Sequence, residues 1–268
     1  MEMMQDVKTG IFYPGFEIYP LYDPMGFIYG DGVKGPRPEN RSLDSIRASL
    51  LDPDCSGPET VYSIAMDVGK LCDMLEMKER NLLYGAVTYS KGLLGNETVR
   101  SQGHIHAVSS SCGMSTCEVY EIWKGSAYIY MQESGNDDPG RCFAVYGEPG
   151  DVIIVPPGWV HAAITADPEE NMTFGAWCVR DYGFEYADVR RHKGIAWFYI
   201  CDNGQKKFVR NEHYRQAADI VVKKPRKYTE FGIEDGIPVY TQFEKDPDRF
   251  LFVSKPQTVI ELWKHFEP

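Results

Sequence analysis

Two histidines separated by one residue, His104 and His106 in the segment GHIH, are the first candidates for chemistry. Side chains on a β-strand alternate between its two faces, so an extended segment would point both imidazoles to the same side. The same alternation in EVYEIWKG puts Glu118 and Tyr120 on one face and Glu121 on the other. Only one of the two carboxylates can therefore join the histidines, and we choose Glu118.

A third histidine, His161, ends the segment PGDVIIVPPGWVH, where an apolar run enters a Pro-Pro-Gly turn. We expect this turn to fold His161 back toward the other two histidines. Three imidazole nitrogens and one carboxylate oxygen suit Fe(II), Mn(II), Ni(II) or Zn(II), without the thiolates of a structural zinc site. Four ligands leave two octahedral positions for water or substrate oxygens, so the pattern predicts a metal centre able to polarise a carbonyl group.

The elements that must hold these residues are strands. From about residue 60 to 200, short apolar runs alternate with turns rich in Gly, Pro, Asn and Asp. This spacing is typical of a β-sandwich or barrel, so we predict an all-β fold. The runs are VYSIAMDV, LLYGAVTYS, EVYEIWKGSAYIYMQ, RCFAVY, DVIIVPP, HAAIT, MTFGAWCV and GIAWFYI.

Helices are predicted to be few, short and peripheral. Residues 42–51 have Ser42 as a candidate N-cap, with Pro53 closing the helix. Residues 68–83 and 257–268 are two further candidates. We expect residues 1–60 to be an N-terminal extension packed on the barrel, 61–202 the metal-binding barrel and 203–268 a C-terminal extension.

Composition excludes several classes of protein. A net charge of -11 opposes nucleic acid binding, and it requires a local pocket of donors for any phosphorylated substrate. Seven cysteines without a CxxC pair fit neither a disulfide framework nor a thiolate zinc site, which favours the cytoplasm. The start MEMMQDVKTGIF lacks the pattern of a leader, and no apolar stretch is long enough to span a membrane.

Two spaced motifs resemble those of cupins. Gly150, Pro156, Gly158 and His161 follow the second cupin motif at full spacing, without its terminal Asn. The first motif is His104-x-His106, then Glu118, six residues and a glycine; between His106 and Glu118 stand eleven residues, AVSSSCGMSTC, which we interpret as an inserted loop. The resemblance implies a cupin barrel, a double-stranded β-helix of the jelly-roll type.

Further segments resemble the cupin-type glucose-6-phosphate isomerases over roughly residues 60–200. They are SQGHIHA, CEVYEIWKG with its following Gln132, PGDVIIVPPGWVHAA, GLLGNE and DYGFEY. The resemblance implies a homodimer that interconverts glucose 6-phosphate and fructose 6-phosphate with one divalent metal per subunit, Fe(II) being our first choice. The matched metal ligands are His104, His106, Glu118 and His161.

The chemistry implied is transfer of hydrogen between C1 and C2 of the sugar. Glu118 could serve as ligand and base in a cis-enediol route, with Tyr120 hydrogen-bonding the sugar, whereas a hydride shift would use the same residues differently. For the phosphate, Ser101, Gly103 and Tyr186 match the family pattern. Sequence leaves both routes open.

Two positions depart from the family pattern. Phe184 stands where the family has His, and Cys178 where it has Tyr, so each replacement removes a hydrogen-bonding group that could help to hold an anion. We expect the candidate replacement cations to be solvated surface side chains: Lys91, Arg100, Arg180 and Lys193.

Three other functions compete with this one. An isomerase of another sugar or sugar phosphate is favoured if Phe184 and Cys178 have changed the phosphate pocket. A non-catalytic metal-dependent sugar-binding cupin would bind without turnover. A metal-dependent dioxygenase would consume oxygen, and the fold alone does not exclude it.

Overall fold

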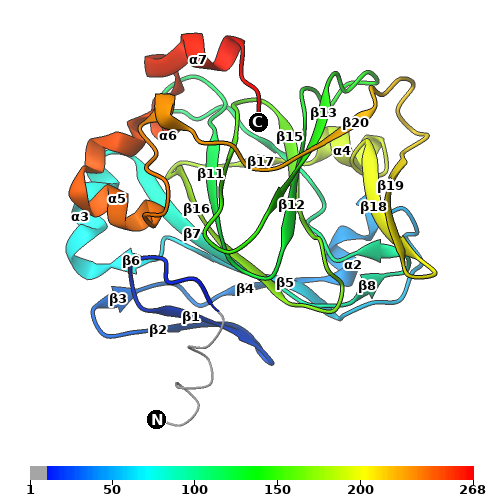
Figure 1. Ribbon diagram of the computed structural model, residues 1–268, viewed down its shortest axis with the longest axis horizontal. Coiled ribbons are helices and arrows are strands. Elements are labelled where there is room, and N and C mark those ends of the chain that lie inside the picture. The colour runs from blue at the N-terminus through cyan, green and yellow to red at the C-terminus, as the bar shows by residue number, and fades with distance from the viewer. Residues whose placement is uncertain (1–10) are drawn as a thin grey trace.

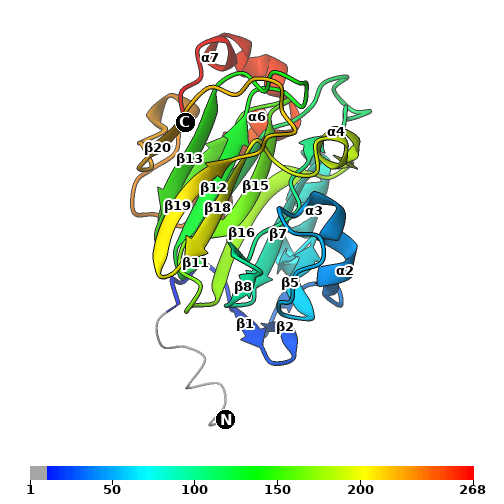
Figure 2. The same ribbon diagram turned by 90° about the vertical axis from the view of Figure 1, so that its right-hand side faces the viewer.

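The computed structural model describes residues 11–268, and its centre is two facing β-sheets (Figures 1 and 2). The expectation about a leader depends largely on residues 1–10, which lie outside the described part. The larger sheet has the order β14 (Val152–Val155), β11 (Glu118–Lys124), β16 (Met172–Val179), β7 (Leu82–Tyr89), β5 (Thr60–Met66) and β4 (Glu39–Ser42).

The smaller sheet faces it across the core. Its order is β15 (Val160–Thr165), β12 (Ala127–Gln132), β13 (Cys142–Gly147) and β20 (Ile220–Lys223). β10 (Ile105–His106) approaches β15 through an antiparallel bridge between His104 and His161. β11 pairs with β14 and β16, and β12 pairs with β13 and β15. This pairing is that of a jelly roll, so the predicted all-β cupin barrel is confirmed.

Short strands and turns surround the barrel. β1 (Ile18–Tyr22) forms a hairpin with β2 (Met25–Tyr29), and β3 (Val33–Lys34) pairs with β6 (Gly69–Lys70). β18 (Trp197–Asp202) pairs with β19 (Gln205–Arg210) and with β9 (Glu97–Thr98), which pairs with β8 (Leu93–Leu94). β17 (Phe184–Glu185) pairs with β10 and leads into α4 (Ala187–Arg191).

The predicted helices exist but are shorter than their segments. Ser42 caps α2 (Leu43–Ile46) by accepting a hydrogen bond from Ser45 N at 3.3 Å, and the chain continues as η1 (Arg47–Ser49) before it becomes extended. In the segment 68–83, η2 (Leu71–Asp73) and α3 (Met74–Glu79) form. The turn ends at Asn81, whose φ is 53°, and the chain then enters β7.

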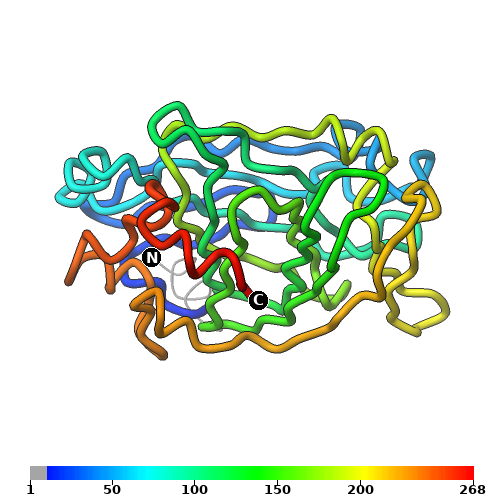
Figure 3. Tube along the Cα trace, turned by 90° about the horizontal axis from the view of Figure 1, so that it is seen from above, coloured from blue at the N-terminus to red at the C-terminus, as the bar shows by residue number. Residues whose placement is uncertain are grey.

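The C-terminal segment runs along the molecule after β19 (Figure 3) and covers the outer face of the larger sheet. Trp177 on that face stacks on Tyr240 with ring centroids 5.7 Å apart. The elements are η3 (Thr229–Phe231), α5 (Val239–Lys245), η4 (Pro247–Phe250), α6 (Leu251–Ser254), η5 (Pro256–Val259) and α7 (Ile260–Lys264). Within residues 11–268, no helix combines the length and the apolar character needed to cross a membrane. All seven cysteines are free thiols.

A buried carboxylate joins this helical layer to the sheet. Glu121, only 1% exposed, accepts hydrogen bonds from Val239 N at 2.7 Å and from Trp123 Nε1 at 3.1 Å. Burial raises the pKa of Glu121 to about 8, although these bonds oppose the rise. The group therefore enters the folded protein in its protonated form at neutral pH.

We expect the Glu121 carboxyl group to make the folded state less stable as pH rises. Its pKa is higher in the folded than in the unfolded chain, so the stability present below about pH 4.5 is lost as pH rises toward 8. Between pH 5.5 and 8.5, the free energy of unfolding should fall by on the order of 3 kcal/mol more in the wild type than in Glu121→Gln. Urea titrations at several pH values measure this difference, and parallel profiles for the two proteins would contradict it.

Candidate metal centre

The HxH segment places its two imidazoles side by side, as predicted from strand alternation. The His104 and His106 ring centroids are 5.4 Å apart and their planes differ by 22°. His104 and His161 exchange backbone hydrogen bonds of 3.1 and 2.9 Å, which hold their rings 4.3 Å apart. The turn before β15 therefore brings the third histidine to the first two.

Glu118, the first residue of β11, completes the cluster. Its Oε2 lies 3.2 Å from His161 Nε2 and 3.3 Å from His106 Nε2. The four ligand atoms of His104, His106, Glu118 and His161 lie within 4.8 Å of one another, a spacing at which they could hold one metal ion.

The nitrogen atoms of the histidines show that a cation fits this cluster. Two Nδ1 atoms face backbone carbonyls, that of His106 at 3.0 Å from Thr116 O and that of His161 at 3.0 Å from Trp159 O. Such contacts orient the opposite nitrogen toward a metal. His104 Nε2 and His106 Nε2 are buried without a hydrogen-bond partner. Because unpartnered buried polar atoms are costly, a metal ion is a suitable partner for both.

The protonation states also suit metal binding. Burial lowers the pKa of His104 well below its usual value and also lowers the pKa of His161, so both rings are neutral near pH 7. Burial acts to raise the pKa of Glu118, but the neighbouring imidazoles of His106 and His161 outweigh it and hold this pKa well below its usual range. Neutral imidazole and ionised carboxylate are the forms that bind metals.

Two side chains donate to the Glu118 carboxylate. Tyr120 Oη, on the same face of β11 as predicted, donates to Oε2 at 2.7 Å. Cys178 Sγ, on β16, donates to Oε1 at 3.2 Å. Burial raises the pKa of the Tyr120 phenol and of the Cys178 thiol well above their usual values, so both remain donors. Cys178 therefore lies at the carboxylate, at the metal end of the site.

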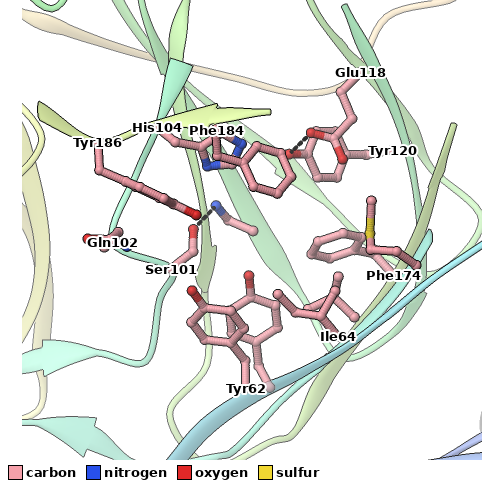
Figure 4. Close-up of a pocket in the computed structure, with 14 residues that line it drawn as sticks. Tyr62, Ile64, Ser101, Gln102, His104, Glu118, Tyr120, Phe174, Phe184 and Tyr186 are labelled. Carbon is pink, nitrogen blue, oxygen red and sulfur yellow. Dashed lines mark hydrogen bonds between the residues drawn. The ribbon is translucent and has the colours of Figure 1, made fainter. Parts of the chain in front are cut away.

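A pocket opens from the His104 and Glu118 side of the cluster (Figure 4). Its walls are mostly aromatic and aliphatic, with a few hydroxyl and amide groups, a usual composition for a small-molecule site. The lining residues are Tyr62, Ile64, Met66, Val87, Tyr89, Ser101, Gln102, His104, Glu118, Tyr120, Ala163, Phe174, Phe184 and Tyr186. Strand prediction located Tyr62, Tyr89 and Phe174 on strands but did not mark them as site residues. For Gln102, the only indication in the sequence of a place in the site was its position between Ser101 and Gly103.

The three residues predicted to bind substrate lie at different places. Ser101 lines the pocket, and its Oγ accepts a hydrogen bond from Ala163 N at 3.2 Å. Tyr186 also lines the pocket, with its ring 6.0 Å from that of His104. Gly103 is not among the described lining residues. Its φ is +88°, and a Cβ there would meet Ile195 Cγ2 at 2.7 Å, so glycine is required for close packing.

Phe184 walls the metal end of the pocket. It is the strand partner of His106, and its ring lies 4.4 Å from the His104 ring and 5.7 Å from the His106 ring. The departure from the family's His therefore places an apolar ring, without a hydrogen-bonding group, against the cluster.

The cations considered from sequence do not line this pocket. Arg100 is fully buried and donates to Glu97 Oε2 at 2.6 Å and to Ser101 O at 2.9 Å, so its expected solvation is wrong. Arg180 makes two hydrogen bonds to Asp67, at 2.8 and 2.7 Å, and is also not a solvated side chain. Lys91 and Lys193 are exposed, as expected.

The inserted loop, residues 107–117, is an ordered connection between β10 and β11. Asp181 anchors it by accepting hydrogen bonds from Ser109 Oγ at 2.9 Å, from Ser110 Oγ at 2.8 Å and from Ser111 N at 3.0 Å. The pKa of Asp181 is held well below its usual range because these bonds outweigh its desolvation. The loop therefore lengthens the connection without displacing Glu118 from the histidines.

Comparison with known proteins points to one family. Residues 55–217, more than half of the chain, match the family model described as Glucose-6-phosphate isomerase (GPI). The chain is 29% identical over 141 residues to the glucose-6-phosphate isomerase of Pyrococcus furiosus, covering 53% of this chain and 69% of the relative. It is also 29% identical over 140 residues to the protein of the same name from Pyrococcus horikoshii, covering 52% and 68%.

Similarity to solved structures is weaker. A structure described as giving insights into the mechanism of oxalate oxidase has a TM-score of 0.36 and 13% identity, covering 48% of this chain and 56% of that chain. Vicilin from Corylus avellana has a TM-score of 0.35 and 12% identity, covering 48% and 33%. Likeness at this level says nothing about chemistry.

Proposed function

Because the chain belongs to the glucose-6-phosphate isomerase family, we propose that it interconverts glucose 6-phosphate and fructose 6-phosphate in the pocket beside His104, His106, Glu118 and His161. The observation that carries this proposal is the meeting of three imidazoles and one carboxylate at a pocket with aromatic and hydroxyl walls. A metal held there would supply Lewis acidity toward the sugar carbonyl and its neighbouring hydroxyl.

Glu118 is the group that moves the proton. Its ionised carboxylate would remove hydrogen from C2 of the open-chain aldose while a proton passes from O2 to O1, and it would return the hydrogen at C1 to give the ketose. Tyr120 and Cys178 hold the carboxylate from both oxygens. Ser101 and Tyr186 line the pocket and would bind the substrate, while Gly103 keeps the segment before His104 close to its neighbours.

Metal identity, assembly and location are further parts of the proposal. The nitrogen-rich ligand set favours Fe(II), with Mn(II), Ni(II) and Zn(II) as substitutes, at one ion per subunit. A homodimer follows the family resemblance and can be tested by light scattering. The seven free thiols support a reducing, cytoplasmic location.

An anaerobic coupled assay that converts fructose 6-phosphate to glucose 6-phosphate tests the proposed reaction. Chelated protein should be inactive, and reloading with at least one of Fe(II), Mn(II), Ni(II) or Zn(II) should restore turnover. Turnover that persists in chelated, metal-free protein would contradict the metal requirement. If no metal restores turnover, the substrate pair is wrong. That result would favour another sugar phosphate, with Phe184 and Cys178 as the residues that changed the pocket.

A further inference from the structure

One part of the pocket is built from hydroxyl groups. Figure 4 shows Tyr62, Ser101 and Tyr186 with their hydroxyl oxygens pointing into the same region, away from Glu118. Among the described lining residues, Glu118 is the only carboxylate, and it lies at the metal end. The hydroxyl region therefore offers hydrogen bonds to an anion, and no carboxylate among the described residues lines that end of the pocket.

Arg41 adds positive charge to this region. It is the direct cross-strand partner of Tyr62 in the pairing of β4 with β5, so both side chains lie on the pocket face of the sheet. Burial raises the pKa of Tyr62 and of Tyr186, and the Arg41 charge opposes the rise at both phenols, as a cation close to both should. The Arg41 partner, Glu39, lies 3.2 Å away and is 71% exposed, and such exposed pairs are weak.

Arg190 adds a second cation, which does not line the pocket itself but contacts two residues that do. It lies on α4, with Cζ 5.1 Å from the Tyr186 ring centroid, and its Nε donates to Gln102 Oε1 at 3.1 Å. Both partners line the pocket. A guanidinium group has five N–H donors, so the Gln102 bond leaves Arg190 able to serve a further acceptor.

We infer that Arg41 and Arg190 supply the positive charge that binds the phosphate group of the substrate, beside Tyr186, which the family resemblance already assigns to the phosphate. The inference rests on the proposed function, since it assigns the phosphate end of that substrate. Guanidinium groups pair with phosphate oxygens in a fork geometry, and two of them provide the local positive charge that a chain of net charge -11 needs. Arg41 precedes the family-matched residues 55–217, so the family match does not account for it.

Calorimetric binding of sorbitol 6-phosphate, which cannot isomerise, tests the subsite on metal-loaded protein. Arg41→Gln and Arg190→Gln should each raise its Kd about tenfold, the usual worth of a hydrogen bond to a charged group. The KM for fructose 6-phosphate should rise similarly, while kcat and metal content stay within twofold of the wild type. Arg191→Gln is the matched control on α4, because its guanidinium bonds Gly135 O and Asp188 instead.

The outcomes separate this inference from the proposed function. Loss of sorbitol 6-phosphate affinity in both variants, without loss in Arg191→Gln, supports the subsite even if no isomerisation is detected. Affinities within twofold of the wild type in both variants overturn it even if the wild type is an active isomerase. Absence of binding to the wild type also overturns it.

Discussion

Replacing His161 with alanine should remove most of the bound metal and lower turnover by about a thousandfold. Outer-shell changes alone cost about 10- to 100-fold in metal affinity or activity, and His161 is a proposed direct ligand. The substitution removes the Nε2 that lies 3.2 Å from Glu118 Oε2, so the cluster loses one of its four ligand atoms beside the carboxylate. Metal analysis after reloading, together with the coupled assay, measures both losses.

The exposed His213 provides the matched control for this variant. His213→Ala should keep the metal content and turnover of the wild type, and circular dichroism should show both variants folded. Wild-type metal content and activity in His161→Ala would show that the metal centre has been assigned to the wrong residues.

Glu118→Gln should lower kcat by about a thousandfold while much of the metal remains bound. The amide cannot accept the C2 proton, and general acid–base groups contribute roughly 100- to 10,000-fold to such reactions. The three histidines remain to hold the ion, although a neutral amide is a weaker ligand than a carboxylate. Assays at saturating substrate and metal separate the loss of proton transfer from weaker binding.

The next carboxylate on the strand supplies the control, because Glu121 points to the opposite face of β11 and into the helical layer. Glu121→Gln should therefore keep the wild-type kcat. Turnover in deuterated water adds an independent measurement, because deuterium at C1 or C2 of the product would show transfer through an exchanging base and exclude a pure hydride shift. Wild-type kcat in Glu118→Gln would show that Glu118 is not the base.

Local sequence patterns were sufficient to identify the proposed metal ligands. Strand alternation grouped His104 with His106 and separated Glu118 from Glu121, and the Pro-Pro-Gly turn predicted the return of His161. The structure brings these residues together because each relation depends on a few neighbouring residues and on the period of two of a strand. The same regular strands and turns predicted the all-β barrel.

The two ends of the chain were harder to interpret. Residues 1–60 and 203–268 were proposed as extensions, and in the structure each provides a strand to one of the main sheets, β4 to the larger and β20 to the smaller. β4 is polar, with the sequence ENRS, and short polar strands have no apolar alternation to mark them. The position of such a strand in the sheet is set by the strand with which it pairs.

The sequence by itself therefore determined the barrel and the residues proposed to hold a metal, through periodicity and motif spacing. Only the tertiary structure decided that Cys178 donates to Glu118, that Arg100 is buried, and that Arg41 and Arg190 lie beside the hydroxyl end of the pocket. Arg41 and Arg190 are almost 150 residues apart in the chain. No local pattern relates such residues, because their proximity results from sheet pairing and from the packing of α4 against the barrel.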